Sequence, residues 1–292
     1  LSPVLLQQLE LPGIHLSDLD CAIVGNALRR LGPGLTVLDL RDCGMGIDGV
    51  MAFSAGMSRA RLTALHVLLL GGNWTEAQLE MAVACTRAVC EGLVLSGASN
   101  LETLSLSNGM LPQGALALCE ALAALRPQRL AFLDVSDSRF GCGGAQALLS
   151  AHARAPLLAL ERLDLFACHI GPKGGEAIGS LLAVTGGGHS PLAAPPPPLQ
   201  SLCLADNAMQ DRGLVALASA LRTNAALAAS LTDLDLSSNG LGLDDDSSLR
   251  MPCGGENACD EFARALTHHA TGVHTGGGVG LRRLNLSHNF LG

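Results

Sequence analysis

The pattern Leu-x-x-Leu-x-Leu-x-x-Asn, with Cys replacing Asn in some copies, recurs along the whole chain and constrains its fold more than any other feature. It is clearest as LTDLDLSSN from Leu231, LRRLNLSHN from Leu281 and LQSLCLADN from Leu199. Four further copies begin at Leu35, Leu65, Leu101 and Leu160, and two degenerate copies begin at Leu6 and Leu130. A fixed period of this kind indicates a repeat architecture, in which each unit adds one layer to a continuous core.

The spacing between copies predicts what each unit contains. The first leucines of successive copies lie 29, 30, 36, 29, 30, 39, 32 and 50 residues apart, so the basic unit is about 29 residues long. A unit of this length holds one short strand and one helix. In the strand, the two-residue alternation sends Leu38 and Leu40 to the core and Asp39 to the opposite face. Downstream, the apolar residues of 214–221 recur at helical spacing.

We therefore expect an α/β solenoid shaped like a horseshoe, with about nine repeats, parallel strands on the concave face and helices on the convex face. One unit cannot bury its own apolar face, so the units should stack into a single domain over residues 1–292. We expect the Asn or Cys of each motif to be buried and hydrogen-bonded to neighbouring turns. A Gly six residues later should let the loop approach the helix start closely, as at Gly49, Gly144, Gly174 and Gly213.

Three long steps between copies predict local departures from the basic unit. The step of 36 residues predicts a longer helix over 76–93. The step of 39 residues predicts an insertion near 185–198, whose Pro195–Pro198 run is either a plain loop or a polyproline II docking motif. The step of 50 residues predicts an insertion near 242–256 and a Gly-rich loop near 270–280.

Composition and charge limit the compartments and the partners that we expect for the protein. The ten Cys residues lie at repeat and helix positions rather than in paired terminal clusters, and no signal peptide is visible, which favours an intracellular, reducing compartment. No apolar run is long enough to span a bilayer, and a net charge of −8 argues against a nucleic-acid partner. Because the chain starts at Leu1 and stops at Gly292 inside the last loop, we expect a fragment of a longer protein, monomeric by itself.

The sequence holds no catalytic, cofactor or metal motif. Cys259 with His268 and His269 comes nearest to a zinc site, but adjacent histidines point from different faces of the helix expected over 257–269. The run Asp244–Asp246 lacks the glycine spacing of a calcium loop, and the Gly-rich stretches lack the pattern of a phosphate loop. We therefore expect no enzyme activity, no cofactor and no metal.

The functional signal is expected at the strand position between the second and third leucines of each motif, which faces the concave side. The residues at this position are Glu10, Asp39, Leu69, Ser105, Asp134, Asp164, Cys203, Asp235 and Asn285. Five of these nine are acidic, and stacked strands about 4.8 Å apart would concentrate their field on a ligand in the hollow. The alternative is that Asp is only a consensus residue that keeps an exposed strand polar. The candidate partner-binding residues are Asp39, Arg41, Asp134, Asp164, Phe166, Asp233, Asp235, Arg283 and Asn285.

The motif, the unit of about 29 residues and the helix in each unit together resemble the ribonuclease-inhibitor-like leucine-rich repeat family, over essentially the whole chain. The resemblance implies a non-catalytic module that binds a protein partner on its concave face and loop rim, and the acidic column suggests that this partner is basic. Two alternatives stay open. One is a GTPase-activating regulator resembling the Ran GTPase activator, although no full activating loop is matched. The other is the ligand-sensing region of a NOD-like receptor.

Overall fold

The computed structural model describes residues 6–74, 79–184, 199–242, 258–268 and 280–290. The predicted insertions near 185–198 and 242–256 and the Gly-rich loop near 270–280 lie almost wholly outside these ranges. Pro195–Pro198 and Asp244–Asp246 lie outside them too, so their interpretation stays a prediction.

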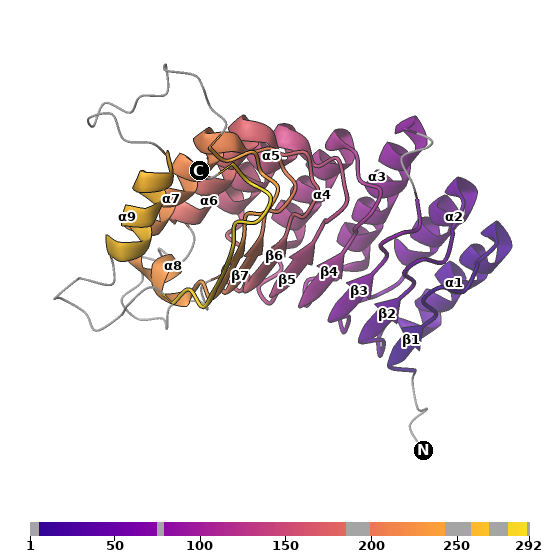
Figure 1. The fold of residues 1–292 in the computed structure, drawn as a ribbon. Helices are drawn as coiled ribbons and strands as arrows, with labels where there is room; N and C mark the ends of the chain where they lie inside the picture. Colours follow the sequence, from indigo (N-terminus) through magenta and orange to yellow (C-terminus); the bar gives the residue numbers. More distant parts are fainter. Residues whose placement is uncertain (1–5, 75–78, 185–198, 243–257, 269–279, 291–292) are drawn as a thin grey trace, which may run out of the picture.

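Nine short strands form one parallel sheet in sequence order, as the repeat count predicts (Figure 1). The strands are β1 (Gln8–Glu10), β2 (Val37–Asp39), β3 (Val67–Leu69), β4 (Thr103–Ser105), β5 (Phe132–Asp134), β6 (Arg162–Asp164), β7 (Ser201–Cys203), β8 (Asp233–Asp235) and β9 (Arg283–Asn285). Each strand covers the third to fifth residues of its motif. Equivalent leucines are paired on adjacent strands, as Leu38 of β2 is with Leu68 of β3. The register therefore repeats without a slip from one unit to the next.

Helices cover the convex side of the sheet and complete the predicted α/β solenoid (Figure 1). The helices are α1 (Asp18–Leu31), α2 (Ile47–Met57), α3 (Leu79–Ser96), α4 (Pro112–Leu125), α5 (Gly141–Arg154), α6 (Gly171–Val184), α7 (Gln210–Thr223), α8 (Ala225–Ser230) and α9 (Ala258–His268). The helix predicted over 76–93 is α3, which ends three residues later than predicted; residues 75–78 lie outside the described ranges. The helix expected over 257–269 is α9. The helical periodicity did not predict α8, a six-residue helix that Asn224 caps by accepting the Leu227 N–H.

The core consists mainly of leucine side chains that pack between the sheet and the helices. Leu35, Leu38 and Leu40 of one motif are all 0% exposed, and their equivalents in the other central repeats are buried in the same way. Strand alternation puts the fourth and sixth motif residues on the same buried face. Since full burial of one leucine contributes about 1.5–3 kcal/mol, the repeated leucines supply the main stabilisation of each layer.

The last position of the motif ties neighbouring repeats together, as predicted. The buried Asn207 accepts the backbone N–H groups of Cys168 at 3.0 Å and Ile170 at 3.2 Å and donates to the Leu165 carbonyl at 2.7 Å. At two equivalent positions a thiol donates to the preceding repeat instead, from Cys43 to Leu11 O and from Cys168 to Val135 O, both at 3.1 Å. These bonds satisfy backbone groups that the short strands leave unpaired.

Two backbone features shape each layer. The eighth residue of every motif has a positive φ; these residues are Gly13, Asp42, Gly72, Asn108, Asp137, Ala167, Asp206, Ser238 and His288. This left-handed residue turns the chain out of the sheet directly after the strand. The predicted glycines allow close approach: a Cβ on Gly213 would lie 2.7 Å from Met209 Cβ, and one on Gly174 would lie 2.4 Å from Ile170 Cγ2.

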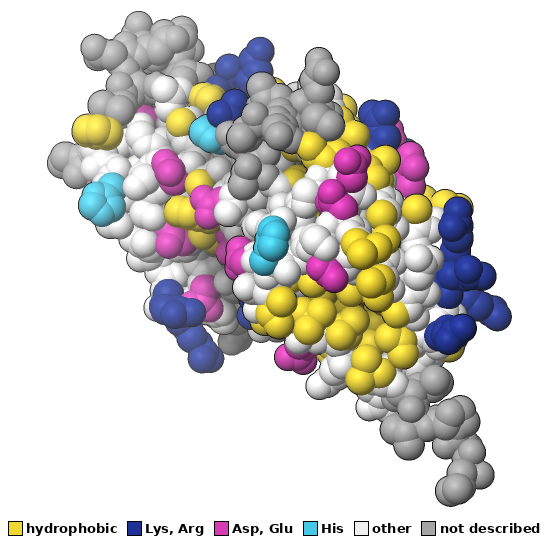
Figure 2. Space-filling model, turned by 90° about the vertical axis from the view of Figure 1, so that its right-hand side faces the viewer, with side chains coloured by type: hydrophobic (Ala, Val, Ile, Leu, Met, Phe, Trp, Pro, Cys, Tyr) yellow, Lys and Arg dark blue, Asp and Glu magenta, His cyan; other side chains and the backbone are white. Residues whose placement is uncertain are grey.

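The N-terminal end of the solenoid leaves apolar side chains on the surface (Figure 2). Leu19 and Ile23 on the outer face of α1 are 71% and 58% exposed, and Ile14 in the preceding turn is 53% exposed. In a solenoid each unit covers the next. The first described repeat therefore has one face that no other described residue covers.

Candidate functional site

The nine candidate residues all lie on the concave side of the sheet or in the turns directly after it. They fall into three groups along the chain: Asp39 and Arg41 at β2, Asp134, Asp164 and Phe166 at β5 and β6, and Asp233, Asp235, Arg283 and Asn285 at β8 and β9. Strand pairing places Asp134 opposite Asp164 and Asp235 opposite Asn285. The structure therefore brings residues together within each group, and intervening strands separate the groups.

The acidic strand position has a structural role that the sequence did not reveal. A side-chain oxygen of the strand residue accepts the backbone N–H two residues later, at 3.1 Å for Asp39, 3.0 Å for Asp134 and Asp164, 2.9 Å for Asp235 and 3.1 Å for Asn285. Each bond holds the turn that ends the strand, as short polar side chains do in Asx-turns. Part of the acidic column therefore follows from local backbone requirements.

Two of the candidate acids are neutralised by arginines. Arg41 donates from Nε to Asp39 Oδ1 at 3.0 Å and from Nη2 to Oδ2 at 2.7 Å, and the Asp39 side chain is only 7% exposed. Although burial of Asp39 opposes its charge, these hydrogen bonds hold its pKa below the ordinary value. Arg283 pairs with Asp233, and the Thr232 hydroxyl donates to Asp233 at 2.6 Å; both bonds lower the Asp233 pKa. Arginines therefore compensate Asp39 in the acidic column and Asp233 beside the column.

Three carboxylates lie close together at β5, at β6 and in the turn after β5. Asp134 accepts hydroxyl hydrogen bonds from Ser105 and Ser136, both at 2.6 Å. Burial raises the pKa of Asp164, and the nearby carboxylates of Asp134 and Asp137 raise it further. Within the described part of the chain, none of these three carboxylates forms an ion pair. We call Asp134, Asp137 and Asp164 the central acidic cluster.

A hollow of about 500 Å³ lies on the concave face beside this cluster. Its lining includes the apolar side chains of Leu69 and Phe132, with Arg162 stacked over the Phe132 ring at 4.3 Å. Arg41 and Asp134 are the two candidate residues in this lining, and Phe166, which is 39% exposed, lies outside it. Phe132 and Arg162 were not among the candidates. Both residues occupy the third motif position, which also faces the concave side. Considering this position in every repeat would have identified them from the sequence.

The other titratable groups fit structural roles. Burial raises the pKa of the Cys90, Cys119 and Cys168 thiols to about 12, so they stay protonated at neutral pH. His152 is buried, accepts the Leu157 N–H at Nδ1 and has a pKa lowered by burial. The described residues contain no group of three His, Cys, Asp or Glu side chains arranged to hold a metal ion. None of the described helices has the length and hydropathy that crossing a bilayer requires.

Comparison with known families gives one match. The family model described as Leucine Rich repeat matches residues 35–54, 160–179, 196–218 and 228–245. Each matched stretch contains one motif with its strand, and three of them run into the helix that follows. No curated protein sequence matches the chain.

Proposed function

Because the chain is a leucine-rich repeat protein and such repeats are generally protein-interaction modules, we propose that its concave face binds a segment of a protein partner over β3 to β6. The proposed module is non-catalytic and belongs to the ribonuclease-inhibitor-like class, whose unit length and helix content it shares. The single observation that carries the proposal is the hollow lined by Leu69 and Phe132 beside the central acidic cluster.

The chemistry of this surface defines the partner. An apolar side chain of the partner would pack against Leu69 and Phe132, and burial of such an anchor supplies affinity. Basic side chains next to this anchor would meet Asp134, Asp137 and Asp164, which form no ion pair among the described residues. Arg41 and Arg162 also line the hollow. Such charges accelerate association more than they strengthen the final complex. We therefore propose a basic protein segment with one apolar anchor, rather than a uniformly basic surface.

The test removes the negative charge of the central acidic cluster and preserves the turns that follow the strands. Changing the central cluster to Asp134→Asn, Asp137→Asn and Asp164→Asn preserves a side-chain acceptor, as Asn285 shows in β9. A protein captured by the wild-type chain is purified, and its association rate is measured against salt. We expect the triple variant to associate about tenfold more slowly at low salt. The control Asp235→Asn lies at the same motif position as Asp134 and Asp164 but is separated from them by β7, and its association rate should stay within about twofold. Equal rates for the wild type and the triple variant would refute the proposal.

Neither alternative function draws support from a particular described residue. A GTPase activator would accelerate GTP hydrolysis by candidate GTPases when the protein is added at saturation. A receptor sensing region would bind its ligand without affecting GTP turnover. Measuring GTP hydrolysis with and without the protein separates the first alternative from the proposed binding role.

A further inference from the structure

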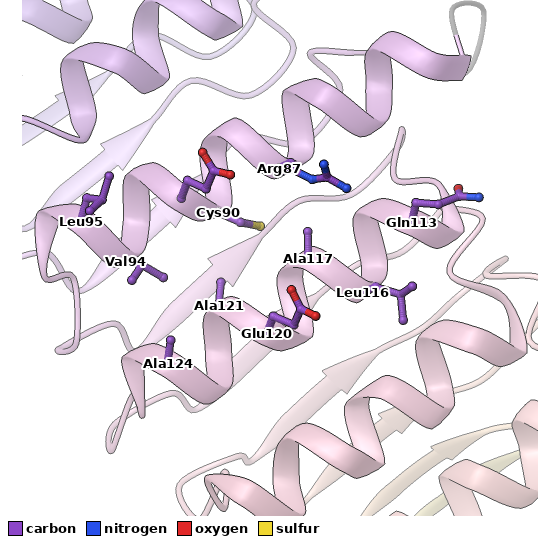
Figure 3. A pocket seen from close by; sticks show the side chains of 11 residues that line it. Arg87, Cys90, Val94, Leu95, Gln113, Leu116, Ala117, Glu120, Ala121 and Ala124 are labelled. Carbon is purple, nitrogen blue, oxygen red and sulfur yellow. The ribbon is translucent and has the colours of Figure 1, made fainter.

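An open groove lies on the convex surface between α3 and α4, on the opposite side of the sheet from the concave hollow (Figure 3). Its volume is about 660 Å³. The side chains of Cys90 and Val94 from α3 and of Ala117 and Ala121 from α4 lie between the two helices. We call this feature the α3–α4 groove.

Small side chains on one wall create the groove. Ala117, Ala121 and Ala124 recur at helical spacing along α4 and line it together. Elsewhere on the convex face, small residues let helices touch: a Cβ on Gly56 of α2 would lie 2.2 Å from the Gly25 carbonyl carbon of α1. Ala117, Ala121 and Ala124 each present only a Cβ atom to the space between the two helices (Figure 3).

The groove carries apolar side chains that an isolated module would keep in water. Leu95 is 69% exposed, Leu116 is 45% exposed and Val94 is 36% exposed, and all three line the groove. Single exposed apolar residues are ordinary, but a cluster around one concave feature marks an interaction surface. Filling the groove would remove Val94 and the alanine wall from water, and Leu95 and Leu116 lie at its rims (Figure 3).

The charges and length of the groove select its occupant. Glu91 on α3 and Glu120 on α4 line it, and neither forms an ion pair in the part of the chain that the structure describes. Arg87 is the one cation among the lining residues. On α4 the lining runs from Gln113 to Ala124, which at about 1.5 Å per residue is about 16 Å. This length matches about three turns of an α-helix.

We propose that the α3–α4 groove binds one amphipathic helix of a partner protein. The apolar stripe of that helix, at positions i, i+3 or i+4 and i+7, packs against Val94, Leu116 and the alanine wall. Lys or Arg side chains beside the stripe pair with Glu91 and Glu120. This interface is independent of the concave hollow, so one protein could be held on each face at the same time.

The test uses two stapled helical peptides of about 15 residues with the same leucine stripe, one flanked by lysines and the other by glutamates. Binding is measured by fluorescence anisotropy with the whole chain. We expect the wild type to prefer the lysine peptide by at least about tenfold, and Glu91→Lys/Glu120→Lys to invert that preference. The control Glu10→Lys/Asp48→Lys makes the same change of net charge at exposed positions outside the groove and should leave the preference unchanged.

A second pair of variants tests the apolar contact. Leu116→Gln should weaken the lysine peptide by about tenfold, whereas Leu19→Gln, at a more exposed apolar position on α1, should have no effect. Circular dichroism should show that all variants stay folded. Equal binding of both peptides, or a preference that ignores the Glu91/Glu120 reversal, would overturn the proposal. Self-association, or binding to neutral phosphatidylcholine vesicles, that Leu116→Gln abolishes would also overturn it, since the groove would then serve a second copy or a lipid surface.

Discussion

Asn207 offers the sharpest test of how the repeats are held together. Its side chain is 1% exposed and connects the sixth and seventh strands' turns through five hydrogen bonds. The backbone N–H groups of Cys168 and Ile170 have its Oδ1 as their only acceptor among the described residues. Asn207→Ala removes this acceptor and leaves both N–H groups buried without a partner.

The expected loss follows from those two groups. A buried donor left unsatisfied costs about 1–3 kcal/mol, so Asn207→Ala should lower the free energy of unfolding by about 2–6 kcal/mol. That is a large part of the total of about 5–15 kcal/mol that is typical of folded domains. Asn207→Cys should cost less, because a thiol there can donate to Leu165 O as Cys168 donates to Val135 O. It would still leave the two N–H groups without their acceptor.

Urea unfolding gives the loss of stability, and hydrogen exchange read by mass spectrometry gives its location. Amides in the turns around 168–170 and 204–207 should exchange faster in Asn207→Ala, while those of the first repeats keep their protection. Asn100→Ala is the control, because exposed Asn100 makes one hydrogen bond, to Thr63 O at 2.7 Å. A loss of stability in Asn207→Ala no larger than that in Asn100→Ala, or a uniform loss of protection along the chain, would contradict this role of Asn207.

Four further outcomes are expected. Gly56→Ala should destabilise the protein by about 1–3 kcal/mol in urea, because its Cβ meets α1 at 2.2 Å, whereas Gly143→Ala in α5, with nothing within 4 Å, should be neutral or stabilising. Since the Asp39 pKa is lowered, its charged form stabilises the folded state above pH 3.8, and this contribution is lost as pH falls through the folded-state pKa. The difference in free energy of unfolding between the wild type and Asp39→Asn should therefore become smaller in acid. The Asp164 pKa is raised, so Asp164→Asn should raise the melting temperature at pH 7, and that gain should vanish below pH 3.8. In native buffer a maleimide should modify exposed Cys142 well before the buried Cys90 and Cys119, and modification of all three at equal rates would contradict the burial described above.

Sequence reasoning reached most of the fold because the determinants are local and repeated. The alternation that buries Leu38 and Leu40, and the Asn or Cys that follows three residues later, recurs in unit after unit, so one reading applies to all nine strands. The end of α3, whose repeat is longer than the basic unit, lies three residues beyond the predicted end. The short helix α8 was missed because six alanine-rich residues carry too little periodicity.

The candidate site was only partly predictable, because the charge of a surface depends on pairs of side chains. The sequence placed Asp39 and Asp134 in one acidic column. In the structure Asp39 accepts hydrogen bonds from Arg41, whereas Asp134 accepts them from two serine hydroxyls, one of which lies 29 residues away in the sequence. Partner contact by any of the nine candidates stays a prediction, and Asp39 is the weakest of them because its carboxylate is covered.

By itself, the sequence determined that the chain is a stack of strand-and-helix units with a leucine core, since the motif and its period are written into every repeat. Only the tertiary structure decided where that stack has usable surfaces. The concave hollow joins Phe132, Arg162, Asp134 and Asp137 from neighbouring strands and turns, and the α3–α4 groove depends on how closely two helices approach. Both features arise between repeats, and the motif specifies only the residues within one repeat.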